Sequence, residues 1–113
     1  MFYQSPAGDS PVDEFLDGLA SRPRAKVEKF LELLEEQGPR LPRPFADAVD
    51  GPIRELRVGF GRLEIRLLYF FHGRRIIVVT HGFLKKTRAI PPEEIVSAHK
   101  AHADWIIRHG GAR

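Results

Sequence analysis

Cysteine is absent from this chain of 113 residues, which excludes disulfides, a thiolate nucleophile and a cysteine zinc site. Long apolar runs are also absent, because the longest, Leu67–Phe71, is far too short to cross a bilayer. The first residues, Met1–Pro6, lack the basic and apolar regions of a signal peptide. We therefore expect a soluble cytoplasmic protein without a membrane partner. The length suits one domain, residues 1–113, with a core that needs no cross-links.

Familiar motifs for catalysis and cofactor binding are missing too. Gly59-Phe60-Gly61 reads as a turn and not as a phosphate-binding loop, and no Ser-His-Asp arrangement is evident. His99 and His102 have a spacing that occurs in metal sites, but no third ligand is obvious and both fit the apolar stripe of a helix. We therefore expect no metal and no cofactor.

The charge is distributed unevenly along the chain. Residues 1–51 carry six Lys/Arg and ten Asp/Glu, a net charge of −4, whereas residues 52–91 carry nine and two, a net charge of +7. Residues 92–113 are neutral overall. A basic segment of this kind predicts attraction to a polyanion. The alternative is a solvated basic sheet face that has no partner.

The N-terminal third has the spacing of two amphipathic helices. Ser10 can cap the first helix, and Pro11 suits its first turn. Apolar residues recur every three or four positions at Val12, Phe15, Leu16 and Leu19, and again at Val27, Phe30, Leu31 and Leu34. The second helix ends at Gly38-Pro39. We expect the two helices to form a hairpin whose apolar stripe faces a sheet.

Strand patterns follow a proline-rich loop at residues 39–52. The predicted strands cover Ile53–Val58, Leu63–Phe71 and Ile76–His81, and residues 2–4 can add an edge strand. The third strand is almost wholly apolar, so we place it at the centre of the sheet. A last helix opens at Pro91–Glu94 and ends at Gly110-Gly111. This order predicts an α+β fold: a small antiparallel meander of three or four strands, packed with an N-terminal helical hairpin and a C-terminal helix.

Two arginines and two lysines are the main candidates for a functional site. A turn centred near residue 61 puts residue 57 opposite residue 65 or 66, so Arg57 and Arg66 should present paired guanidinium groups. Lys85 and Lys86 follow the third strand and can reach the same place. Cations so placed suit phosphodiester cleavage, because they hold the phosphate and offset charge gained in the transition state.

A different pairing is open for the two arginines. They can form ion pairs with Glu55 and Glu64 on the sheet face, in which case they are structural.

His81 is the titrating group nearest the lysines, and it can donate a proton to a leaving oxygen. Strand alternation places His81 on the face of Ile77 and Val79, which favours a hydrogen-bonded role at the strand end instead. Phe83 can stack on a nucleic-acid base. The full set of RNA-binding candidates is Arg62, Phe83 and Arg88.

Four sequence blocks together match a known family pattern. They are Glu55-Leu56-Arg57; Arg66 with Leu67-Leu68-Tyr69-Phe70; His81-Gly82-Phe83-Leu84-Lys85-Lys86-Thr87; and Pro91 with Glu94-Ile95 and Ala98. The chain thereby resembles the phage-derived RelE-like (HigB-type) toxins of the RelE/ParE superfamily. The resemblance covers nearly the whole chain, its most specific part is the Gly-Phe-x-Lys-Lys-Thr block, and it implies a RelE-like fold.

The resemblance also implies a function. Such a protein is the toxin of a type II toxin–antitoxin system and a ribosome-dependent mRNA endoribonuclease, in which the ribose 2′-hydroxyl attacks the adjacent phosphate without a metal. Arg57 and Arg66 would bind or stabilise the scissile phosphate, and Lys85 and Lys86 would lie where the family places basic functional residues. Relatives use a late tyrosine or histidine for acid–base work. The only tyrosines here are Tyr3 and Tyr69, so a lysine or His81 would have to serve.

The implied partners are a cognate antitoxin, often of helix-turn-helix type, and the ribosome with its mRNA. Two other functions fit the same scaffold. One is non-catalytic inhibition of DNA gyrase, as in the ParE branch. The other is an inactive module that binds nucleic acid or protein.

Overall fold

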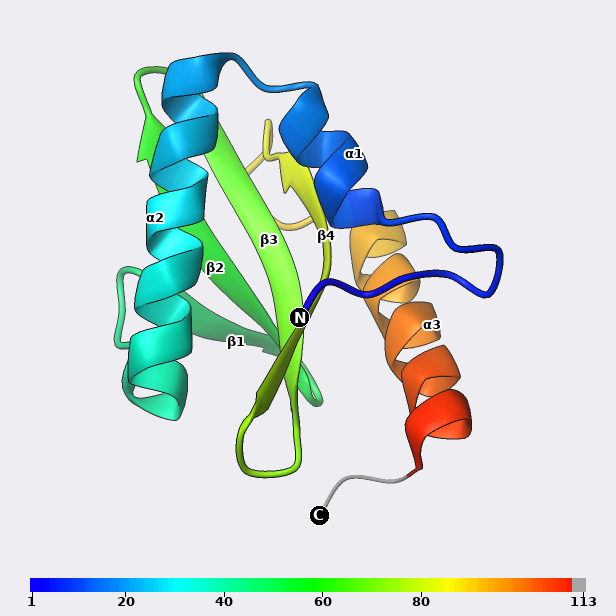
Figure 1. Cartoon of the computed structure of the whole chain (residues 1–113). Helices are drawn as coiled ribbons and strands as arrows, with labels where there is room; N and C mark the ends of the chain where they lie inside the picture. Colours follow the sequence, from blue (N-terminus) through cyan, green and yellow to red (C-terminus); the bar gives the residue numbers. More distant parts are fainter. Residues whose placement is uncertain (111–113) are drawn as a thin grey trace.

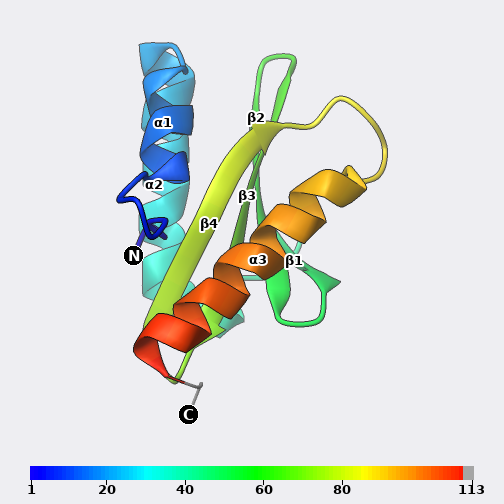
Figure 2. The ribbon, with the colours of Figure 1, turned by 90° about the vertical axis from the view of Figure 1, so that its right-hand side faces the viewer.

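The computed structural model describes residues 1–110 and has helices on both faces of one sheet. The elements are α1 (Pro11–Asp17), α2 (Ser21–Gln37), a short 3₁₀ helix (Gly38–Arg40), β1 (Ala46–Asp50), β2 (Ile53–Phe60), β3 (Leu63–His72), β4 (Ile76–Leu84) and α3 (Pro92–His109). The antiparallel strands lie in the order β1-β2-β3-β4. Helices α1 and α2 cover one face and α3 crosses the other (Figures 1 and 2). The predicted α+β fold is confirmed.

The N-terminal helices bury the apolar stripes that their spacing predicts. The Ser10 hydroxyl caps α1 by accepting a hydrogen bond from the Asp13 N–H at 3.4 Å. Val12 and Leu16 of α1 and Val27 and Leu34 of α2 are buried in one cluster with the facing side chains of the sheet. Burying this apolar area is the main force that holds the layer together.

A second apolar cluster fixes α3 to the opposite face. Ala98, Ala101 and Trp105 of α3 pack there against sheet residues that include Leu68 and Phe70. The helix ends at Gly110, as predicted, and Gly111 lies outside the described residues. Within residues 1–110, no helix has both the length and the apolar character that a membrane span requires.

Two features of the sheet differ from the sequence prediction. Residues 46–50 form β1 although we expected a loop, because their pairing with β2 outweighs the weak strand propensity of a segment rich in Ala and Asp. β4 lies at the edge of the sheet and not at its centre. Its apolar run is explained by helices on both faces, and Phe2 forms a bridge beside Val79 on its outer edge.

A β-bulge in β4 corrects the predicted orientation of His81. Leu68 pairs with His81 but the next residue, Tyr69, pairs with Val79, so Thr80 is an extra residue. The Thr80 hydroxyl lies 3.2 Å from the carbonyl oxygen of Leu68. The extra residue reverses the alternation, and His81 therefore lies on the α3 face instead of the face that carries Val79.

The same bulge turns Gly82 towards α1, where no side chain can fit. A Cβ atom on Gly82 would lie 2.5 Å from one ring carbon of Phe15 and within 3.0 Å of two more. Helix α1 can approach β4 this closely only because residue 82 is glycine.

Replacing Gly82 with alanine should therefore destabilise the fold by about 1–3 kcal/mol, the usual cost of overpacking. Urea unfolding followed by circular dichroism measures the change. The matched control is Gly59→Ala, because a Cβ at Gly59 in the same sheet meets no atom within 4 Å. Equal stability of the two variants would contradict the proposed contact with Phe15.

Candidate functional site

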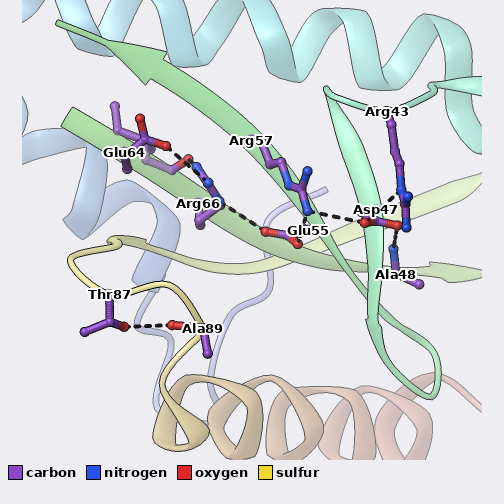
Figure 3. Close-up of polar contacts among 10 residues, drawn as sticks. Arg43, Asp47, Ala48, Glu55, Arg57, Glu64, Arg66, Thr87 and Ala89 are labelled. Atoms are coloured by element: carbon purple, nitrogen blue, oxygen red, sulfur yellow. Dashed lines mark hydrogen bonds and ion pairs between the residues drawn. The ribbon is translucent and has the colours of Figure 1, made fainter. Parts of the chain in front are cut away.

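One row of side chains crosses three strands on the α3 face of the sheet. Arg57 of β2 pairs directly with Arg66 of β3, which confirms one of the two predicted registers. Arg66 pairs in turn with Phe83 of β4. Phe83 belongs to the apolar cluster under α3, and the loop between β4 and α3 runs next to the arginines (Figure 3). The predicted arginine pair is therefore brought together by the sheet itself.

A buried carboxylate, Glu55, joins the two arginines. The Nη2 group of Arg57 donates a hydrogen bond to Glu55 Oε2 at 3.1 Å. Arg66 Nε lies 3.1 Å from Glu55 Oε1, but neither of these two atoms has a hydrogen-bond partner. The angle is thus unsuitable for a hydrogen bond, and the contact of Arg66 with Glu55 is an ion pair only. Glu55 is 5% exposed and is shared by both guanidinium groups.

Two outer carboxylates extend this cluster to a chain of alternating charge. Arg66 donates to Glu64 at 3.2 Å and to the carbonyl of Ile65 at 3.0 Å. Asp47 of β1 accepts from Arg57 at 3.3 Å and lies 3.0 Å from Arg43. Figure 3 shows these contacts in sequence across the strands. The arginines therefore form the alternative ion pairs with Glu55 and Glu64. They also remain cross-strand neighbours, so both arrangements considered from the sequence are present together.

Contacts in the network shift the pKa values of Arg57 and Asp47 in the direction that favours their charged forms. The hydrogen bond to Glu55 raises the pKa of Arg57 further above its ordinary value, although burial opposes this. The pKa of Asp47 is lowered, mainly by a hydrogen bond from the Ala48 N–H and then by Arg43. Both groups therefore carry full charge near neutral pH.

Four further cations lie on the segments next to these strands, three in the loop after β4 and one at the β2–β3 turn. Lys85 follows β4, and its backbone N–H donates to the carbonyl of Glu64 at 2.7 Å, which holds the loop beside β3. Lys86 and Arg88 are exposed in this loop, and Arg62 is exposed at the β2–β3 turn. No carboxylate of residues 1–110 lies within 4 Å of any of these four charges. They are available to an anionic ligand.

His81 is held between Thr80 and Glu94 of α3. Its Nδ1 lies 2.9 Å from the Thr80 hydroxyl and its Nε2 lies 3.0 Å from Glu94 Oε1. Burial lowers the pKa of His81, and the Glu94 carboxylate opposes this shift. An ionised Glu94 carboxylate can only accept, so Nε2 is the donor in that contact, while Nδ1 faces the Thr80 hydroxyl. Because both nitrogens have partners, the geometry favours the structural role at the strand end over proton donation.

Phe83 lies next to His81 and is only 8% exposed. The two rings stack with their centroids 5.9 Å apart, and Phe83 belongs to the apolar cluster under α3. The ring thus offers little surface for a nucleic-acid base in this structure.

The histidines with metal-site spacing have other contacts. His99 Nε2 lies 2.7 Å from Asp50, and the His102 ring packs edge-on against Phe70. In the described part of the chain, no three His, Asp or Glu side chains gather in a way that could hold a metal ion.

Two residues of the site escaped the sequence analysis. Asp47 was missed because β1 was expected to be a loop, and its alternation with two alanines is a weak strand signal. Glu94 entered only as part of the start of the last helix and of the family pattern, whereas its carboxylate also contacts His81. The contacts of Asp47 with Arg57 and of Glu94 with His81 join distant parts of the chain, so the residues next to them in the sequence do not indicate them.

Comparison with known proteins indicates the family of this chain. The model of the family described as "Phage derived protein Gp49-like (DUF891)" matches residues 14–102, which contain every residue of the candidate site. The chain belongs to this phage-derived family, and the RelE-like, HigB-type resemblance is confirmed.

A protein of Mycobacterium tuberculosis named "Putative toxin HigB2" is 36% identical over 77 residues, which are 63% of this chain and 38% of that protein. The chain thus spans well under half the length of this curated relative.

The contacts of His81 predict its titration. Its pKa should lie below the ordinary value of about 6.5, and Glu94→Gln should lower it further because the opposing carboxylate is removed. A histidine whose pKa is depressed on folding contributes stability above the unfolded-state pKa, and this contribution is lost as the pH falls through the folded-state value. NMR titration of the imidazole measures the pKa directly. A His81 pKa above that of an unfolded peptide, or a higher His81 pKa in the Glu94→Gln variant, would contradict the buried contact between His81 and Glu94.

Proposed function

We propose that this chain is the toxin of a type II toxin–antitoxin pair and that it cleaves mRNA on the ribosome. The observation that carries the proposal is the direct pairing of Arg57 with Arg66 on the α3 face, beside a loop that carries Lys85 and Lys86 without ion-pair partners in the described structure. Membership of the Gp49-like family and the name of the M. tuberculosis relative support the toxin role. The basic loop and arginine pair support an RNA ligand, because phosphate contacts dominate affinity for nucleic acids.

The proposed reaction is transesterification within the RNA strand. The 2′-oxygen attacks the adjacent phosphorus and the bond from phosphorus to the 5′-oxygen breaks, which leaves a 2′,3′-cyclic phosphate and a 5′-hydroxyl. One proton leaves the 2′-hydroxyl and one is added to the departing 5′-oxygen. Negative charge accumulates on the phosphate oxygens in the transition state, where preorganised cations are most effective.

Each cation has a distinct part in this proposal. Arg57 and Arg66 lie on a rigid sheet and bind the scissile phosphate, since guanidinium groups match its oxygens in geometry. Lys85 and Lys86 lie on the adjoining loop and stabilise the developing charge, and a lysine is the candidate for proton transfer. Arg62 and Arg88 contact neighbouring phosphates. His81 positions β4 against α3.

The partners follow from the same assignment. A cognate antitoxin, which we propose to be a helix-turn-helix protein, keeps the toxin inactive, and an acidic surface on it would complement the basic loop. The ribosome supplies the mRNA and orients it on the arginine pair. Both partners and the substrate are cytoplasmic.

Alanine substitution of the four cations tests the assignment. We expect the Arg57/Arg66/Lys85/Lys86 quadruple variant to relieve growth arrest on induction, and the Lys85/Lys86 double variant to lower the cleavage rate by about 10²–10³. The double variant is the cleaner probe, because neither lysine forms an ion pair in the described structure. Mapping of RNA 5′ ends after induction measures cleavage.

The control for lost charge is Arg74→Ala with Arg75→Ala, which removes two exposed cations from the β3–β4 turn. This variant should retain full cleavage. Persistent arrest and cleavage in the quadruple variant would overturn the site. DNA-damage markers without new RNA ends would indicate gyrase inhibition instead, and no growth defect from the unaltered chain would indicate an inactive binding module.

A further inference from the structure

The three carboxylates around the arginine pair differ in how firmly they are held. Glu55 is buried and contacts both arginines. Asp47 contacts two arginines and also accepts the backbone N–H of Ala48 at 2.8 Å. Glu64 contacts Arg66 alone, and its side chain is 57% exposed. These differences suggest different roles when an anion arrives.

Glu55 is a permanent part of the site for an electrostatic reason. Arg57 and Arg66 are direct cross-strand neighbours, and like charges in that position repel. The carboxylate of Glu55 lies between them and compensates both charges. Removing it would leave two guanidinium groups facing each other with no carboxylate between them and only the outer contacts to Asp47 and Glu64, and one of the two arginines is only 7% exposed.

Glu64 is held by the kind of contact that is easily exchanged. An ion pair with one largely exposed partner contributes little free energy, because water and salt screen it. The bond at 3.2 Å occupies Arg66 Nη2, while the other two nitrogens of this group face Glu55 and the Ile65 carbonyl. The Glu64 contact is therefore the outward-facing one. A phosphate oxygen accepts the same hydrogen bond as a carboxylate oxygen.

We propose that Glu64 is an exchangeable counter-ion that the RNA phosphate displaces from Arg66, and that Glu55 is a positioning residue that keeps both arginines aimed at that phosphate. The inference rests on the proposed function for the identity of the ligand. Glu55 acts through the arginines and does not touch the RNA. The unliganded protein thus keeps its phosphate site filled by its own side chain.

Two variants with the same change of net charge test the proposal, because Glu64→Gln and Glu55→Gln each remove one negative charge. Simple attraction of RNA would strengthen binding in both. We expect Glu64→Gln to bind a 2′-O-methyl single-stranded RNA several-fold more tightly than the unaltered chain, and Glu55→Gln to bind it more weakly. In cleavage assays Glu64→Gln should lower KM with kcat nearly unchanged, whereas Glu55→Gln should lower kcat by about tenfold or more.

The matched control is Glu28→Gln on α2, at the other face of the sheet. Its carboxylate is 52% exposed and pairs with a single arginine, Arg24, so it matches Glu64 in exposure and in the number of its arginine partners. Equal RNA affinity of Glu64→Gln and Glu28→Gln would overturn the exchange. An unchanged kcat and affinity in Glu55→Gln would overturn the positioning role.

Further measurements separate folding and catalysis from the inference. Thermal unfolding shows whether Glu55→Gln is folded. If it is not, Glu55→Asp keeps the charge but shortens the side chain, and we expect folded protein with reduced kcat. Because 2′-O-methyl RNA cannot be cleaved, binding tests the inference alone. If Glu64→Gln binds more tightly than Glu28→Gln but the unaltered chain cleaves no RNA, the proposed function fails and the exchange at Arg66 holds.

Discussion

The repulsion between two guanidinium groups on neighbouring strands is the constraint on which the site depends. The register of β2 and β3 places Arg57 beside Arg66, and the buried carboxylate of Glu55 makes that arrangement stable. A buried ion pair of this kind is weak evidence of a contribution to stability, since its desolvation is costly. Its value is geometric, because it fixes on a rigid surface, before any ligand arrives, the two guanidinium groups that we propose to bind phosphate.

The two apolar layers allow this polar cluster to exist. Helices α1 and α2 pack on one face of the sheet, and α3 crosses part of the other face. The uncovered end of that face carries Arg57 and Glu64, and the loop after β4 adds Lys85 and Lys86 beside it. The apolar packing and the proposed ligand site thereby occupy different regions of one small sheet.

Local patterns predicted most of the fold, and long-range contacts account for what they missed. The helix stripes and the cap at Ser10 follow from short-range rules, as does the alignment of Arg57 with Arg66 across a two-residue turn. The edge position of β4 and the existence of β1 depend on tertiary pairing that alternation does not encode. The bulge at Thr80 reversed the expected orientation of His81 for the same reason. In the site, the cations were predictable, but the sharing of Glu55 was not.

The most direct test of the central claim is a crystal structure of this chain with a short 2′-O-methyl RNA. The account predicts a phosphate oxygen within hydrogen-bond distance of Arg57 and Arg66, with Glu64 turned away and Glu55 unmoved between the arginines. An RNA bound only along the loop of Lys85 and Lys86, with the Arg66 contact to Glu64 intact, would contradict it.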